Sequence, residues 1–204
     1  MAQRQQSFIM VGHSHIRNFG TFMSGTFQGR NMFNLNLSFD QVRIACHGEG
    51  GMLLAHLDRN DSASQYFLEL FRNASGCIIH IGDNDVANYA PEYLAQEIIA
   101  KAIAIAQAYG IENMFVAPLL PRRSGARGDV VTYNKKALEV NRILSESAPG
   151  QLSILKSLFA FPDENLARYI DQEVYFRRDG VHLNDFGNRR CFNYFRGVVI
   201  RTIR

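Results

Sequence analysis

Short, continuous apolar runs along the chain are separated by longer segments in which apolar residues recur with helical periodicity. The apolar runs cover residues 7–12, 41–47, 76–82, 113–120 and 151–158. Helical patterns follow them through residue 22 and at 50–58, 62–73, 91–110, 129–147 and 184–203. This alternation is typical of βαβ units with right-handed crossovers, so it predicts a five-stranded parallel sheet with helices on both faces. No linker or internal repeat interrupts it, and we expect one three-layer α/β/α domain over residues 1–204.

The segment after the fourth apolar run has a different composition. Residues 121–129, PRRSGARGD, contain two glycines, one proline and three arginines, which indicates a loop. In an open parallel sheet, such a loop lies at the carboxyl edge, where ligands bind. Contact with a substrate and a solvated connection are both open for this loop, and a solvated connection is the commoner case.

Composition places the chain among globular proteins. It has 204 residues, of which 47% are hydrophobic and 20% charged. No apolar run approaches the ~18 residues of a membrane span, and the N-terminal MAQRQQ lacks the pattern of a secretion signal, so we expect a cytoplasmic protein. The three cysteines have no CxxC spacing, which disfavours a disulfide framework or a zinc knuckle. Cys46 and Cys77 fall in strand-like runs and are expected to be buried thiols.

Positive charge is concentrated near the C-terminus. The net charge is +3, but residues 177–204 contain seven arginines and two aspartates. Such a helix face can meet nucleic acid, acidic lipid or an acidic protein. No nucleic-acid-binding motif accompanies the arginines, so a solvated helix face is the favoured interpretation.

Candidate chemistry begins at the end of the first apolar run, in the sequence FIMVGHSHIRNFG. Gly12 ends the predicted strand in a turn, and Ser14 follows at the edge of the sheet where ligands bind. Ser14 is therefore a candidate nucleophile, flanked by His13 and His15. The alternative is that Ser14 only caps the following helix, which is the usual role of serine at such a position.

A serine nucleophile needs a base, a group that orients the base, and donors for the oxyanion. RRDGVHLND offers Asp179 and His182, which one tight turn can bring together. CHGEGGM offers backbone N–H groups at Gly50 or Gly51, and HIGDNDV offers the side-chain amide of Asn84. Each motif alone also fits an ordinary turn.

Together, these motifs resemble the SGNH hydrolases, also called GDSL esterases and lipases. The matching blocks are GHSH at 12–15, GEGG at 48–51, GDND at 82–85 and DGVH at 179–182. The resemblance spans almost the whole chain. Two positions depart from the family pattern, because His13 replaces an acidic residue next to the serine and Cys46 stands where an asparagine is usual.

The resemblance implies a fold and a set of site residues. The implied fold is a flavodoxin-like sandwich, and the implied triad is Ser14, Asp179 and His182. The implied oxyanion hole combines the N–H groups of Ser14 and Gly51 with the side chain of Asn84. No metal or cofactor is implied. The chain is also similar to esterase-like domains of some animal retroelements.

Two function classes follow from these residues. The first is a serine esterase that hydrolyses small-molecule or lipid esters through an acyl-enzyme, and the second is a catalytically silent binding or assembly module with the same fold. A third interpretation, zinc binding by His13, His15 and His47, lacks the usual ligand spacing. We expect His13 to hydrogen-bond within the loops of the site and not to act as the base. The substitution His13→Asp, which restores the acidic residue usual at this position, should then retain the fold and keep or raise esterase turnover.

Overall fold

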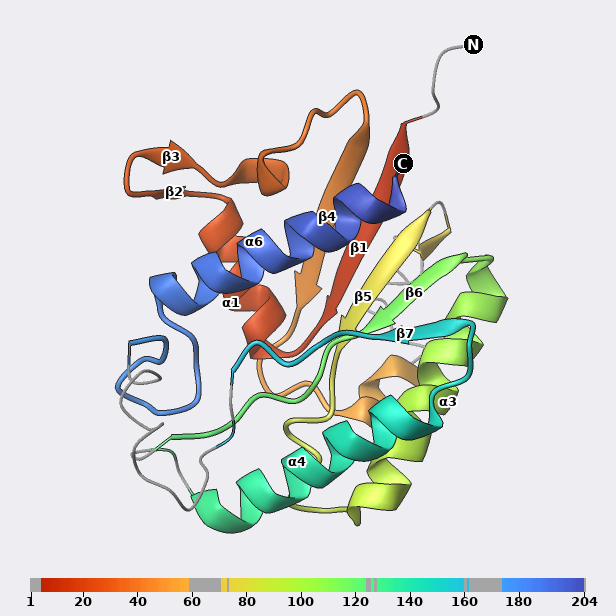
Figure 1. Ribbon diagram of the computed structural model, residues 1–204, viewed down its shortest axis with the longest axis vertical. Helices are drawn as coiled ribbons and strands as arrows, with labels where there is room; N and C mark the ends of the chain where they lie inside the picture. The colour runs from red at the N-terminus through yellow and green to blue at the C-terminus, as the bar shows by residue number, and fades with distance from the viewer. Residues whose placement is uncertain are drawn as a thin grey trace.

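The computed structural model describes residues 5–58, 71–72, 74–123, 126, 128–159, 161 and 174–203. Its centre is a five-stranded sheet in which all neighbouring strands are parallel (Figure 1). The strands in spatial order are β4 (Val42–Gly48), β1 (Gln6–Gly12), β5 (Gly76–His80), β6 (Asn113–Val116) and β7 (Leu152–Ile154). The predicted five-stranded parallel sheet is therefore confirmed.

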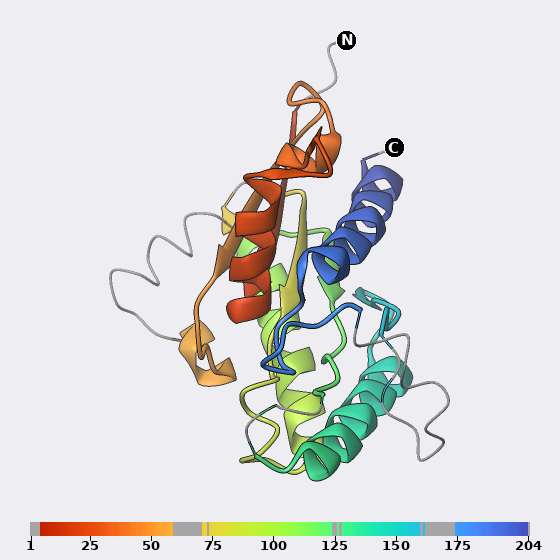
Figure 2. The same ribbon diagram turned by 90° about the vertical axis from the view of Figure 1, so that its left-hand side faces the viewer.

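Helices cover both faces of the sheet. One face carries α1 (Ser14–Met23) and α6 (Asp185–Thr202), and the other carries α3 (Pro91–Tyr109) and α4 (Val130–Ser147) (Figures 1 and 2). The three-layer α/β/α prediction is confirmed. The boundaries of α3 follow its sequence, because proline fits a first helical turn and Gly110 ends the helix in the left-handed conformation, with φ of 65°.

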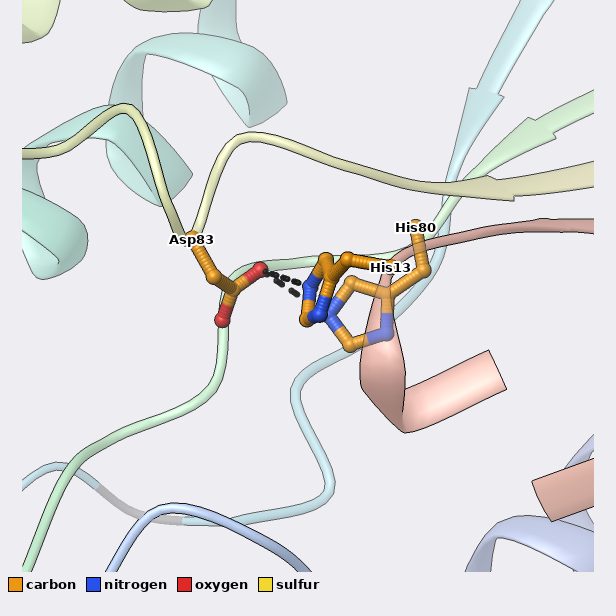
Figure 3. Close-up of side chains that lie close together, drawn as sticks. All are labelled: His13, His80 and Asp83. Carbon is orange, nitrogen blue, oxygen red and sulfur yellow. Dashed lines mark hydrogen bonds and ion pairs between the residues drawn. The ribbon is translucent and has the colours of Figure 1, made fainter. Parts of the chain in front are cut away.

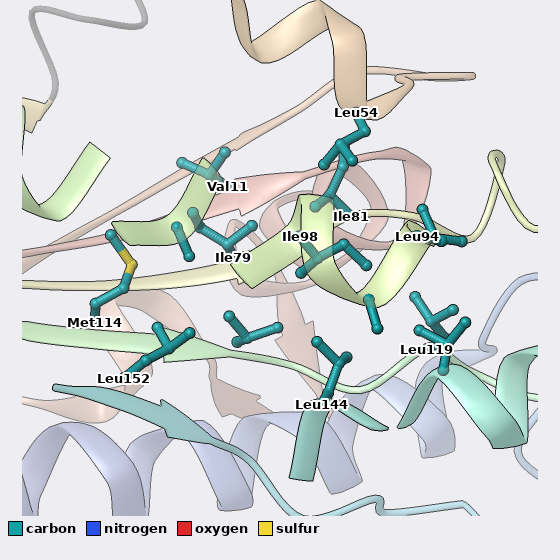
Figure 4. Packing of buried hydrophobic residues seen from close by; sticks show 14 of the residues in the cluster. Val11, Leu54, Ile79, Ile81, Leu94, Ile98, Met114, Leu119, Leu144 and Leu152 are labelled. Atoms are coloured by element: carbon teal, nitrogen blue, oxygen red, sulfur yellow. The ribbon is translucent and has the colours of Figure 1, made fainter. Parts of the chain in front are cut away.

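Burial on both faces explains why the strands are apolar runs and do not alternate with polar residues. In β1, Ile9 and Val11 belong to the core beneath α3 and α4, part of which is drawn in Figure 4. Phe8 and Met10 belong to the core beneath α1 and α6. All four side chains are fully or almost fully buried, so either face of the strand removes apolar surface from water.

Three parts of the chain differ from the sequence-based expectations. The helix expected over 50–58 is a short 3₁₀ helix, η2 (Leu54–Asp58). The helix expected over 62–73 lies outside the described residues, apart from residues 71 and 72. An unpredicted antiparallel hairpin follows α1, formed by β2 (Thr26–Phe27) and β3 (Arg30–Asn31), and a 3₁₀ turn, η1 (Phe33–Asn36), follows it.

The arginines of α6 contact the protein's own chain. The Arg190 guanidinium lies 5.2 Å from the ring centre of Tyr175, and Arg196 Nε donates a hydrogen bond to the Leu35 carbonyl at 3.1 Å. The prediction of a solvated helix face is therefore only partly correct, because these arginine side chains also pack the helix against neighbouring loops. Among the residues described, no helix has both the length and the apolar character that a membrane crossing requires.

The cysteines are free thiols. Cys77 and Cys191 are buried, as expected for the former, and Cys46 is half-buried. Burial raises the pKa of Cys46 and of Cys191 to about 12. These thiols are therefore protonated near neutral pH and act as small apolar groups.

Candidate active site

The predicted site residues meet at the carboxyl ends of the strands, where β1 passes into α1. Gly12 is required there, because a Cβ on this residue would lie 1.9 Å from the carbonyl oxygen of His80. The close approach allows the His13 N–H to donate to that oxygen at 3.4 Å. His13 is the N-cap of α1, and its Nδ1 accepts from the His15 N–H at 3.5 Å. The alternative that Ser14 caps the helix is wrong, since Ser14 is the first helical residue.

Ser14 and His182 are in direct contact although 168 residues separate them in the sequence. Ser14 Oγ lies 2.9 Å from His182 Nε2. This distance lies within the range in which an imidazole can take a proton from a hydroxyl. The other ring nitrogen, Nδ1, lies 2.8 Å from Asp179 Oδ2. A carboxylate at Nδ1 favours the tautomer with the proton on Nδ1, which leaves Nε2 as an acceptor facing Ser14.

A tight turn holds Asp179 beneath the imidazole. Its Oδ1 accepts the backbone N–H groups of Val181 and His182, both at 2.9 Å. Gly180 occupies the turn with φ of 66°, and its carbonyl accepts the Arg123 N–H at 2.7 Å. Partial burial on its own would raise the pKa of Asp179, but the hydrogen bonds from His182 and the turn lower it below its usual value. Asp179 is therefore ionised at neutral pH.

A second histidine–aspartate cluster is formed by His13, the residue before Ser14, with His80 and Asp83 (Figure 3). His13 Nε2 lies 2.8 Å from Asp83 Oδ2, and His80 Nε2 lies 3.2 Å from the same oxygen without the alignment of a hydrogen bond. Asp83 Oδ1 accepts the Leu120 N–H and the Tyr133 hydroxyl, both at 3.1 Å. The expectation that His13 hydrogen-bonds within the loops of the site is confirmed.

The protonation of this cluster follows from its burial and its donors. Burial alone would raise the pKa of Asp83, but His13, His80 and their contacts lower it well below its usual value, so this carboxylate is charged. Burial lowers the pKa of His13 although Asp83 opposes the shift, and it lowers that of His15 well below its usual value. Both imidazoles are therefore neutral near pH 7, and Asp83 is held by hydrogen bonds more than by full ion pairs.

His13, His80 and Asp83 are also the described residues that could most readily share a metal ion. Their ligand atoms lie within 4.8 Å of one another, and zinc accepts nitrogen and carboxylate ligands. However, His13 Nδ1 faces the His15 N–H and Nε2 faces Asp83, an arrangement that favours a ring proton on Nε2 donated to the carboxylate. Hydrogen bonding is the role that this tautomer supports. His47, included in the zinc interpretation from sequence, faces Glu49 instead at 3.6 Å.

The expected oxyanion donors lie in two neighbouring loops. Asn84 Nδ2 donates to the Met52 carbonyl at 3.0 Å, which ties the GDND loop to the GEGG loop and fixes the amide. Gly51 precedes Met52 with φ of 73°. Ser14 and Asn84 line one cavity, and Gly51 is not among its lining residues.

Four polar residues near this site had no role in the sequence-based analysis. His80 and Asp83 belong to motifs quoted above, whereas Tyr133 lies on α4 and Arg122 lies in the loop after β6. Asp83, Arg122 and Tyr133 line the same cavity as Ser14. A signal was present for both, because His80 ends β5 and Asp83 follows the apolar run at the ligand-binding edge. No such signal was present for Tyr133, because in the sequence it occupies one of the apolar positions of a predicted helix.

Comparison with known proteins identifies the architecture. Neither a family model nor a curated protein sequence matches the chain. Among solved structures, the chain is similar to a GDSL-like lipase from Bacteroides thetaiotaomicron, with a TM-score of 0.63 and 17% identity over 96% of this chain and 88% of that one. It is also similar to a lipase from a goat rumen metagenome, with a TM-score of 0.62 and 13% identity over 94% and 96% of the two chains.

A third similar structure carries the family's name in its description. It is a member of the lipolytic G-D-S-L family from Veillonella parvula, with a TM-score of 0.57 and 16% identity over 96% of this chain and 97% of that one. The chain has the GDSL (SGNH) hydrolase fold. At these identities the likeness concerns the fold, so the chemistry must be argued from the side chains that the GDSL fold brings together here.

Proposed function

We propose that this protein is a serine ester hydrolase with Ser14 as nucleophile, His182 as general base and acid, and Asp179 as the residue that orients the base. The observation that carries the proposal is the continuous hydrogen-bond chain from Ser14 Oγ through His182 to Asp179, with distances of 2.9 and 2.8 Å. The GDSL fold of solved lipases supports the same conclusion. No step requires a metal or an organic cofactor.

The reaction proceeds in two halves. Ser14 Oγ attacks the ester carbonyl carbon while His182 Nε2 takes the serine proton, and a tetrahedral oxyanion forms. The intermediate collapses, the alcohol leaves with the proton from His182, and an acyl group remains on Ser14. Water then attacks this acyl group, His182 again takes a proton, and the acid is released as the proton returns to Ser14.

The Asn84 side chain and the N–H of Ser14 are proposed to stabilise the oxyanion, together with the N–H of Gly51. One N–H of the Asn84 amide is bound to Met52, so the other remains for a substrate oxygen in the shared cavity. Asn84→Ala should lower kcat by about 10²- to 10³-fold, the usual effect of losing one oxyanion donor. If this variant keeps the wild-type kcat, Asn84 does not stabilise the oxyanion and only connects the two loops.

A serine-directed fluorophosphonate probe and short-chain p-nitrophenyl esters test the proposal. The probe should label Ser14, and Ser14→Ala should lose labelling and more than ~10³-fold in hydrolysis rate while retaining its melting temperature. Ser145→Ala is the matched control, because Ser145 lies exposed on α4. A wild-type protein that neither reacts with the probe nor hydrolyses any ester would be a catalytically silent binding module with this fold.

A further inference from the structure

Arg122 places a positive charge in the cavity that contains Ser14. The cavity also contains Asn84. The Arg122 guanidinium carbon lies 3.9 Å from the ring centre of Tyr133, and Nη2 donates to the Asp83 backbone carbonyl at 3.3 Å. Both backbone polar groups of Arg122 bond to the side chain of Asn134, at 2.8 and 2.9 Å. The guanidinium is therefore held in one position at the site.

This positive charge has no carboxylate partner among the residues that the structure describes. Asp83 is the nearest candidate, but its two carboxylate oxygens are occupied by His13, Tyr133 and the Leu120 N–H. Among the oxygens of Asp83, only the backbone carbonyl accepts a hydrogen bond from Arg122. The Nε of Arg122 is buried and has no hydrogen-bond partner within the described part of the chain. A buried donor without a partner is costly, so the described residues leave this guanidinium only partly satisfied.

We propose that Arg122 binds an anionic group of the substrate, a carboxylate or a phosphate, so that the site selects small anionic esters. The inference rests on the proposed esterase function of the same cavity. A guanidinium matches the paired oxygens of carboxylate and phosphate groups, and such charge-assisted hydrogen bonds are among the strong ones. Arg122 and Ser14 line the same cavity, so an anion bound by the guanidinium must lie near the ester bond.

Matched substrate pairs test this selectivity on either side of the ester bond. On the alcohol side, 4-acetoxybenzoate is compared with methyl 4-acetoxybenzoate. On the acyl side, mono-p-nitrophenyl glutarate is compared with p-nitrophenyl pentanoate. Rates are corrected with Ser14→Ala, so that spontaneous hydrolysis is removed. In at least one pair, we expect wild-type kcat/KM to be about 10-fold higher for the anionic ester.

The decisive readout is the ratio of the two kcat/KM values, because a general loss of structure cancels from it. Arg122→Gln should lower the anionic-to-neutral ratio by about 10- to 100-fold, and Arg122→Lys should restore part of it. Arg201→Gln is the control for net charge, because Arg201 is exposed near the end of α6. An unchanged ratio in Arg122→Gln would overturn the inference and leave Arg122 as a structural brace.

A binding measurement separates failure of this inference from failure of the proposed function. The Ser14→Ala protein is titrated calorimetrically with 4-hydroxybenzoate and with the neutral 4-hydroxybenzamide. Tighter binding of the anion, lost when Arg122→Gln is added, supports the inference even if no ester is hydrolysed. Equal affinity for the two compounds would overturn it even if the neutral esters are hydrolysed.

Discussion

Two histidine–aspartate pairs flank Ser14 with the same 2.8 Å separation but in opposite environments. The side chains of His13 and Asp83 are 2% and 5% exposed, whereas those of His182 and Asp179 are 28% and 46% exposed. The ring protons also differ in position. His13 accepts at Nδ1 and donates from Nε2, while His182 donates from Nδ1 and faces Ser14 with Nε2.

The difference teaches that contact distance alone does not assign a role to such a pair. The basic nitrogen of His13 faces the N–H of a helix, so it is unable to receive the serine proton. The basic nitrogen of His182 faces the hydroxyl, and solvent exposure lets this ring exchange protons with water and substrate. The exposed pair is suited to chemistry, and the buried pair is suited to holding the nucleophile loop.

The largest expected effect comes from Asp179→Asn. The substituted oxygen can still accept the backbone N–H groups of the turn, but the amide would donate toward His182 Nδ1 and stabilise the wrong tautomer. We expect kcat to fall by about 10⁴-fold with little change in thermal stability. The measurement is p-nitrophenyl acetate hydrolysis alongside calorimetry, with Asp185→Asn, an exposed residue at the start of α6, as control. A loss below tenfold would remove Asp179 from the proposed triad.

The corresponding change in the buried pair, Asp83→Asn, should act on stability. The variant keeps an acceptor for Leu120 and Tyr133 but sets an N–H against the His13 N–H. We expect the free energy of unfolding to fall by about 2 kcal/mol, the scale for leaving buried hydrogen-bonding groups unsatisfied. Urea unfolding measures it, with Asp40→Asn on the surface as control. A loss below about 0.5 kcal/mol, the scale of surface substitutions, would show that the cluster is not a brace.

Exchanging the two buried residues sharpens the comparison further. The expectation that His13→Asp retains the fold and turnover is not supported by the structure, because a carboxylate there would face Asp83, and two buried like charges repel. Adding Asp83→His restores an opposite partner. We expect the double variant to recover about 1.5 kcal/mol relative to the sum of the single variants, as urea unfolding in a double-mutant cycle would measure. Additive losses would mean that the two side chains do not interact.

The smallest expected effect concerns acid stability. Burial lowers the pKa values of His13 and His15 in the folded protein, so below the ordinary value near 6.5 the unfolded chain binds protons that the folded protein does not. Stability therefore falls as pH falls through this range. His15→Phe should reduce the loss between pH 7.5 and 5.5 by about 1 kcal/mol. An unchanged loss, measured by urea unfolding at both pH values, would mean that His15 does not contribute.

The sequence predicted the sheet and its two helical layers because each strand is buried on both faces and is therefore a continuous apolar run. It also directed attention to Ser14, Asn84, Asp179 and His182, since parallel strands end at one edge and loops there converge. The roles of these four residues, and the narrower likeness to retroelement esterases, remain proposals and predictions.

The buried cluster was less predictable for a physical reason. His13 and Asp83 are 70 residues apart, and their contact depends on how two loops turn, which no periodic pattern encodes. Tyr133 and Arg122 join the site from α4 and the loop after β6. The Arg122 guanidinium stacks on the Tyr133 ring, and this contact depends on side-chain conformations that no sequence pattern encodes. From the sequence, the loop that carries Arg122 could be either solvated or in contact with a substrate.

The 168-residue separation of Ser14 and His182 has a consequence for folding kinetics. The nucleophile belongs to the first crossover of the sheet and its base to the loop before the last helix, so the pair closes only after the intervening strands are placed. Closing such long loops is slow compared with forming local helices. Reactivity of Ser14 toward a fluorophosphonate should therefore appear late in refolding, after helical circular dichroism has recovered, and it can serve as a clock for completion of the tertiary structure.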